Sequence, residues 1–203
     1  MKLFALITIA SVAITTVFAA GFGMGFPQHG APGHESPVLL YDGTYMLRIS
    51  PDAVTSRIYG DRLQELLRDA YRLQNHRVNP VGGSALTAPQ IQGVFNSNRA
   101  MHRFIYLGLG TPGRGLVLAA RLSHDTPPDR GYVFGLLTVR DMGSQAPHMV
   151  LHGYAEVSKG EEVLHAMQHA RYNPAAHLLT PGHSLNIDQV FAELEVLPHG
   201  RRR

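Results

Sequence analysis

Histidine and glutamate side chains follow one another at helical spacing in segment 160–169. His165 and His169 are four residues apart, and Glu161 lies four residues before His165, so a helix would place all three on one face. Imidazole and carboxylate groups arranged in this way can bind zinc. The chain has 12 histidines and no His-Glu-x-x-His motif, which favours the simpler interpretation of solvated helix residues. We therefore expect no metal and no other cofactor.

A second pattern, Gly108-Leu-Gly110-Thr-Pro-Gly113, has the spacing Gly-x-Gly-x-x-Gly. In dinucleotide-binding folds such a loop holds a pyrophosphate at the N-terminus of a helix. The residues that follow, Gly115 to Leu122, are short and strand-like. We therefore interpret the glycines as a turn between two strands. The chain contains no cysteine, which excludes disulfides, thiolate zinc sites and thiol catalysis.

The size and charge of the chain narrow the possible classes of protein. It has 203 residues, of which 44% are hydrophobic, enough for one core and a tail. The formal net charge is +3, and positive residues cluster only at Arg201 to Arg203. Nucleic-acid binding needs positive charge gathered on one face, so we expect no nucleic acid as a partner. The basic tail, 199–203, is interpreted as solvated.

The folded domain is expected to span residues 38–198 and to begin with two strands and a helix. Val38 to Ile49 predicts a hairpin, because Asp42-Gly43 is a dipeptide that favours tight turns. From Gly60 to Leu73 the apolar residues recur on one face with a period of 3.6, which predicts an amphipathic helix capped by Gly60 or Asp61.

The rest of the domain shows mostly short apolar runs bounded by Gly, Pro or Asp. Asn75 to Gln92 is rich in Gly, Pro, Asn and Gln and is expected to be a long surface loop. A second helix is expected from Gly160. Many short strands with only two helices predict a closed β-barrel or a sandwich. The predicted strands are Phe104–Leu109, Gly115–Leu122, Tyr132–Val139, Met149–Val157 and Ile187–Leu197.

The N-terminus, residues 1–26, is hydrophobic and precedes a Gly/Pro/His linker at 27–37. Leu3 to Ala20 carries no charge, and ~20 apolar residues suffice to cross a bilayer as a helix. The stretch ends in Val17-Phe-Ala-Ala20, which a signal peptidase could cleave. Two interpretations stay open: a single N-terminal membrane anchor, with the mitochondrial inner membrane as a candidate, or a leader removed from a secreted or lumenal protein.

Four segments occur in a characteristic order: His76–Pro80 directly after the first helix, Gly115–Ala120, Thr126–Thr138, and His148–Val157 followed by a helix start at Gly160–Leu164. This series resembles the cyclophilin family of peptidyl-prolyl isomerases, whose motifs are F-H-R-V-I-P, G-x-L-x-M-A, T-N-G-S-Q-F-F-I-x-T and H-V-V-F-G-x-V. The resemblance covers Val38 to Leu197. It implies a mainly β protein, a closed antiparallel β-barrel with two short helices.

The resemblance also implies a site. Arg77 matches the family's catalytic arginine, and His76, Phe134 and His148 match substrate-binding positions. Prolyl isomerisation has a barrier of ~20 kcal/mol, because the amide must lose its partial double bond. An arginine that donates to the prolyl nitrogen favours the twisted, single-bonded amide, while an apolar pocket holds the ring.

Several positions depart from the family pattern. Val133 replaces the glutamine that binds the substrate backbone, Gly135 replaces a phenylalanine, and Asn75 replaces an aromatic residue. A pocket without these groups loses orientation and ring contacts. We therefore expect a membrane-associated protein with an eroded active site that serves as an accessory subunit or binding module of a larger membrane complex with protein partners. The alternative is an active secreted or lumenal isomerase acting on proline-containing peptides.

Overall fold

The computed structural model describes residues 37–41, 43–81, 86–97, 102–110, 115–122, 131–140 and 148–196. The predicted N-terminal hydrophobic segment, the linker and the basic tail lie outside these ranges. Within the described ranges, no helix is both long enough and apolar enough to cross a membrane. The predicted transmembrane helix therefore has no counterpart there.

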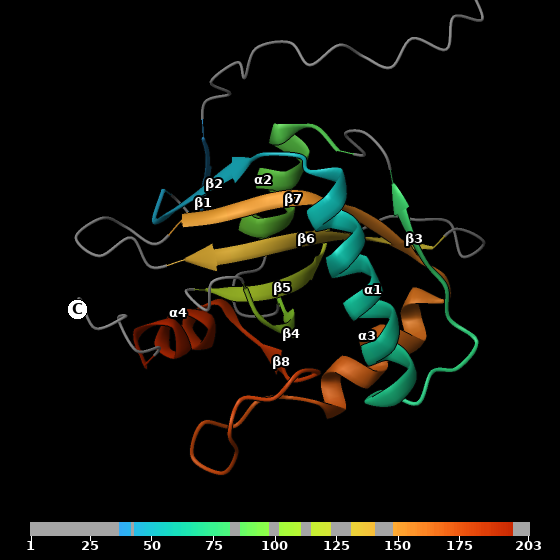
Figure 1. The fold of residues 1–203 in the computed structure, drawn as a ribbon. Helices are drawn as coiled ribbons and strands as arrows, with labels where there is room; N and C mark the ends of the chain where they lie inside the picture. Colours follow the sequence, from blue (N-terminus) through green and yellow to red (C-terminus); the bar gives the residue numbers. More distant parts are fainter. Residues whose placement is uncertain are drawn as a thin grey trace, which may run out of the picture. The chain divides into compact units, whose positions relative to one another are not determined.

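One sheet forms the centre of the domain, and the described residues contribute eight strands to it (Figure 1). The strand order is β1-β2-β7-β6-β5-β4-β8, and β3 pairs with β7 off this path. Strands β4 to β7 are antiparallel neighbours, whereas β2 runs parallel to β7. The strands are β1 (Val38–Leu40), β2 (Tyr45–Ile49), β3 (Val78–Val81), β4 (Phe104–Leu109), β5 (Leu116–Arg121), β6 (Tyr132–Arg140), β7 (His148–Val157) and β8 (Ser184–Leu185).

Helices cover both faces of the sheet. They are α1 (Ala53–Asp69), α2 (Ala88–Ser97), α3 (Gly160–His169) and α4 (Ile187–Val196). Along β5, Leu116, Leu118 and Ala120 share one cluster with apolar residues of α2 and α4. The alternate residues Val117 and Ala119 share a second cluster with apolar residues of α1 and α3. The domain therefore has three layers, helix on sheet on helix, and α1 crosses in front of the strands in Figure 1.

The predicted closed β-barrel with two short helices is wrong, because the sheet is open and the described residues form four helices that pack on it. The apolar runs that predicted barrel strands are buried on both sides: all residues of Leu116–Ala120 are buried. A strand that is buried on both faces reads as a continuous apolar run and needs a helical layer on each side. Two of the helices that supply these layers were not predicted, so the short strands predicted a barrel or a sandwich.

The two missed helices are α2 and α4. The first helix turn of α2 lies in the predicted Asn75–Gln92 loop, and α4 replaces the predicted last strand, Ile187–Leu197. Each helix begins with a capping box, in which a side chain three residues into the helix bonds back to the capping residue. Gln90 Oε1 accepts from the Thr87 N–H at 2.8 Å. At the start of α4 the Gln189 Oε1 accepts from the Asn186 N–H at 3.0 Å. In return, the Asn186 Oδ1 accepts from the Gln189 N–H at 2.8 Å.

The first helix also begins earlier than predicted. α1 starts at Ala53, and Asp52 caps it by accepting from the Val54 and Thr55 N–H groups, so Gly60 lies inside the helix and not at its start. The predicted hairpin is present, since β1 and β2 pair antiparallel and Gly43 in the turn has φ 85°. Strand β4 has the predicted bounds and pairs antiparallel with β5, so a strand and not a helix follows the Gly108 pattern; Gly113 lies outside the described residues.

Candidate functional site

The structure does not bring the four residues of the predicted isomerase site together. Arg77 lies before β3, and its backbone exchanges hydrogen bonds with Ser158 just beyond the end of β7. His148 begins β7. Arg77 and His148 therefore lie at opposite ends of this ten-residue strand, roughly 30 Å apart. Phe134 is fully buried under α1 and α3. A catalytic role for Arg77 and binding roles for Phe134 and His148 stay predictions from the sequence.

His76 lies in the interior next to the start of α3, with 4% of its surface exposed. Its Nε2 lies 3.3 Å from the Lys159 carbonyl oxygen and 3.6 Å from the Glu162 Oε2. The Gln64 side chain donates to the His76 carbonyl at 2.9 Å and accepts from the Val78 N–H at 2.8 Å. These contacts fix the chain between α1 and β3 against α3. The side chain of the adjacent Arg77 is exposed.

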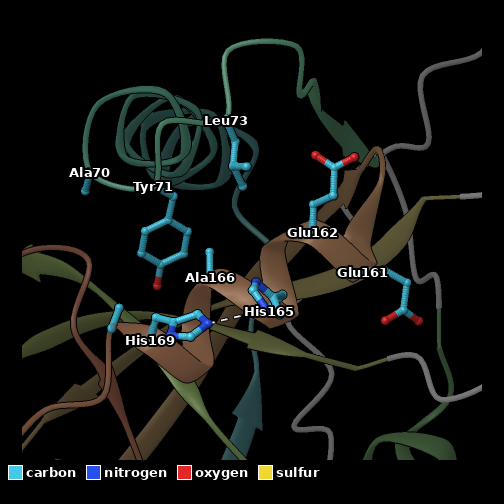
Figure 2. Close-up of a pocket in the computed structure, with 9 residues that line it drawn as sticks. Ala70, Tyr71, Leu73, Glu161, Glu162, His165, Ala166 and His169 are labelled. Carbon is cyan, nitrogen blue, oxygen red and sulfur yellow. Dashed lines mark hydrogen bonds between the residues drawn. The ribbon is translucent and has the colours of Figure 1, made fainter.

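An open groove lies between the C-terminal end of α1 and helix α3 (Figure 2). Its volume is about 830 Å³. The wall from α1 and the residues after it is apolar, whereas α3 contributes ionisable side chains. The lining residues are Ala70, Tyr71, Leu73, Glu161, Glu162, His165, Ala166, His169 and Ala170.

The start of α3 is held in place by Tyr132 of β6. A Cβ added to Gly160 would lie 1.5 Å from the Tyr132 Cδ2, so the ring packs against the backbone where no side chain fits. The Tyr132 hydroxyl donates to Glu161, which raises the pKa of the tyrosine. The guanidinium carbon of Arg121 lies 4.3 Å from the centre of the ring. Val163 and Met167 are buried on the inner face of α3. The face that carries Glu161, His165 and His169 therefore points away from the core.

The opposite wall is also fixed. The Tyr71 hydroxyl donates to the Gly182 carbonyl at 2.9 Å, and burial raises the pKa of this tyrosine far above its ordinary value. Tyr71 is therefore a neutral wall residue and does not act as a base near pH 7. The backbone N–H groups of Ala70, Tyr71 and Leu73 donate to carbonyls of the last turn of α1, so the chain leaving the helix keeps its position.

The imidazoles of His165 and His169 face each other across one turn of α3 (Figure 2). Their Nε2 atoms are 3.4 Å apart, and the ring planes make an angle of 64°. Both side chains are exposed. The carboxylates of Glu161 and Glu162 point away from the pair in Figure 2. In the part of the chain that the structure describes, no three His, Asp or Glu side chains are grouped closely enough to hold a metal ion together.

A second polar cluster lies under α1. The Thr138 hydroxyl is 2.9 Å from the His152 Nε2 and 3.1 Å from the Tyr59 hydroxyl. Burial, with a smaller effect of Arg140, lowers the pKa of His152. A hydroxyl bonded to a neutral imidazole resembles an activated nucleophile. Thr138 is fully buried, however, so no substrate reaches it, and the cluster attaches α1 to the sheet.

The spacing of the histidine pair is visible in the sequence, whereas the groove around the pair is not. Tyr71 and Leu73 are separated from α3 by about ninety residues, and no local pattern indicates that they meet it. The Tyr59, Thr138 and His152 cluster likewise joins three separate elements and has no signal in the sequence.

No protein-family model matches the chain, and comparisons with curated proteins and with solved structures found no significant match. The resemblance to cyclophilins therefore depends only on the order of the sequence motifs, and the closed barrel that it implied is absent from the fold.

Proposed function

We propose, in place of the expectation from the sequence that no metal binds, that this protein binds Zn²⁺ at His165 and His169 and acts as a binding module and not as an enzyme. The observation that carries this proposal is the 3.4 Å separation of the two Nε2 atoms. With zinc–nitrogen bonds of about 2.0–2.1 Å and a tetrahedral angle, two nitrogens on one ion lie about 3.3–3.4 Å apart. A square-planar ion such as Cu²⁺ needs neighbouring nitrogens at about 2.8 Å, so the geometry favours zinc.

The surroundings of the pair support a cation. Glu161 and Glu162 line the same groove and add negative charge to α3, while their carboxylates point away from the imidazoles. Two protein ligands leave two tetrahedral positions for outside donors. Such a site binds reversibly, because fewer protein ligands must dissociate together, and it suits a protein that recruits a partner.

The sequence prediction of an accessory subunit in a membrane assembly is compatible with this role. A metal with open positions would be the point of attachment for protein partners, and Leu3–Ala20 would hold the domain at a membrane. The attachment to a membrane stays a prediction from the sequence, since that segment lies outside the described residues.

Isothermal titration of the full chain with ZnCl₂ tests the proposal. His165→Gln and His169→Gln should each weaken binding at the strongest site at least tenfold. His177→Gln is the matched control, because His177 is exposed and its ring centre is 6.0 Å from that of His183, in another part of the domain. Circular dichroism verifies that each variant keeps its fold. Equal zinc affinity in all four proteins would contradict the proposal.

A further inference from the structure

Two arginines lie on either side of Ser184 in the short strand β8. Arg171, which follows α3 in the chain, pairs with Ser184 in a parallel bridge. On the other side of β8, Ser184 is paired with Ile105 of β4, and Arg103 comes two residues before Ile105. Paired residues of neighbouring strands, and residues two apart along one strand, point to the same face of a sheet. Arg103, Ser184 and Arg171 therefore share one face, with the serine in the middle.

The guanidinium of Arg103 is held in one orientation. Its Nε donates to the Ser184 Oγ at 3.2 Å. Ser184 is fully buried, so this acceptor has a fixed position, whereas Arg103 is half-buried and Arg171 is exposed. The bond uses the Nε and leaves the two terminal nitrogens of Arg103 without a hydrogen bond to any described residue. Arg103 thus presents a fixed pair of N–H donors beside the exposed Arg171.

The positive charges of the two arginines are near enough to repel each other. Burial, followed by the charge of Arg171, lowers the pKa of Arg103, although an arginine stays protonated at neutral pH. The ion pairs among the described residues involve Arg68, His76 and Lys159, and neither arginine takes part in them. An anion bound between the two guanidiniums would replace this repulsion by attraction.

We propose that Arg103 and Arg171 bind a phosphate group with two negative charges, either the free ion or a monoester, and that Ser184 positions Arg103. The inference goes beyond the proposed zinc site and does not depend on it. Guanidinium groups bind phosphate oxygens through paired N–H donors. From the spacing of strands, the Cα atoms of the two arginines are roughly 12 Å apart, so two long side chains can contact one phosphate between them. Two fixed positive charges favour a dianion over a carboxylate or a phosphodiester, which carry one negative charge each.

Isothermal titration of the full chain tests the inference, after metal has been removed on a chelating resin so that zinc does not contribute. The probes are sodium phosphate, phenyl phosphate, dimethyl phosphate and acetate. We expect saturable binding of the first two in the millimolar range and at least tenfold weaker binding of the singly charged probes. The tighter of the first two shows whether the natural ligand is free phosphate or an ester.

Four variants assign the binding to these residues. Arg103→Gln and Arg171→Gln should each weaken phosphate binding at least tenfold. Arg57→Gln is the matched control, because it removes the same charge from an exposed position on α1 and should bind like the wild type. Ser184→Ala should weaken binding in the wild type and have no further effect in Arg103→Gln, since the serine acts through Arg103. Circular dichroism verifies the fold, and the exposed Arg171 provides a test even where a change at Arg103 disturbs folding.

Three results would overturn the inference. Absence of saturable phosphate binding would mean that a group of the chain itself balances the two charges. Equal affinity in the wild type, Arg171→Gln and Arg57→Gln would place the phosphate elsewhere. Binding of dimethyl phosphate as tight as that of phenyl phosphate would show that the site does not select a dianion.

Discussion

The Nε2 of His152 lies 2.9 Å from the hydroxyl oxygen of Thr138, in the layer between α1 and the sheet. The same hydroxyl meets Tyr59 of α1 at 3.1 Å, and the Ser56 hydroxyl donates to the His152 carbonyl at 2.6 Å. Side chains of α1, β6 and β7 thus share one polar cluster, in which Thr138 is fully buried and His152 is half-buried. It holds α1, one wall of the groove, against the strands.

Thr138→Val tests the strength of this cluster. Valine keeps the shape of threonine but leaves the Tyr59 hydroxyl without this partner, which should lower the free energy of unfolding by about 1–3 kcal/mol. Urea denaturation measures the change. In a cycle with Tyr59→Phe, the double variant should lose less than the sum of the single losses. Additive losses would show that the two hydroxyls do not interact.

His152 should make the stability of the protein depend on pH. Burial, followed by the charge of Arg140, places the pKa of His152 below its ordinary value of 6.5. The unfolded chain therefore takes up this proton at a higher pH than the folded chain, and stability falls as the pH drops below 6.5. The difference in unfolding free energy between wild type and His152→Gln should shrink from pH 7.5 to pH 5. A difference that stays constant or grows would contradict this.

Two glycines in helices should respond to alanine in opposite ways. At Gly160 the new Cβ would overlap the Tyr132 ring, so Gly160→Ala should lower the free energy of unfolding by about 3 kcal/mol and disturb the start of α3. At Gly93 nothing lies within 4 Å, so Gly93→Ala should raise stability by about 0.5–1 kcal/mol. Tyr132→Ala should partly rescue Gly160→Ala. Equal effects at both positions would contradict the packing.

Local patterns predicted several elements correctly. The hairpin of β1 and β2, the bounds of β4 and the helix that starts at Gly160 follow from turn residues and periodicity. The missed helices had local signals too: Thr87 with Gln90, and Asn186 with Gln189, are capping boxes. Pro89 and Gly93 in α2 weakened the helical pattern. In α4 the apolar residues Ile187, Val190, Phe191 and Leu194 have helical spacing, so the strand predicted for Ile187–Leu197 is wrong.

The architecture was harder to predict than its elements. The all-apolar run Leu116–Ala120 is compatible with a barrel or with a sheet between two helical layers, and only the number of helices decides between them. The same limit applies to the groove. The His165 and His169 spacing is visible in the sequence, but the meeting of Tyr71 with α3 depends on tertiary packing, because about ninety residues separate them.

The isomerase alternative predicts an isomerisation rate above background that depends on Arg77, whereas a role limited to binding predicts none. Arg77 is exposed and lies at the far end of β7 from His148, so Arg77→Ala should leave the rate of proline-peptide isomerisation unchanged, at the uncatalysed background, in both proteins. A protease-coupled assay on a proline peptide measures this rate. A rate above background that falls in the Arg77→Ala variant would establish the enzyme and contradict a role limited to binding.

In the proposed site both imidazoles of α3 bind one zinc ion through their Nε2 atoms. Nitrogen-detected or long-range ¹H–¹⁵N NMR of the histidine rings measures this directly during addition of Zn²⁺ to the full chain. We expect the Nε2 resonances of His165 and His169 to move together to the chemical shifts of metal-bound nitrogen, while those of the His177 ring stay unchanged. Movement of only one of the two, or binding at other histidines first, would contradict it.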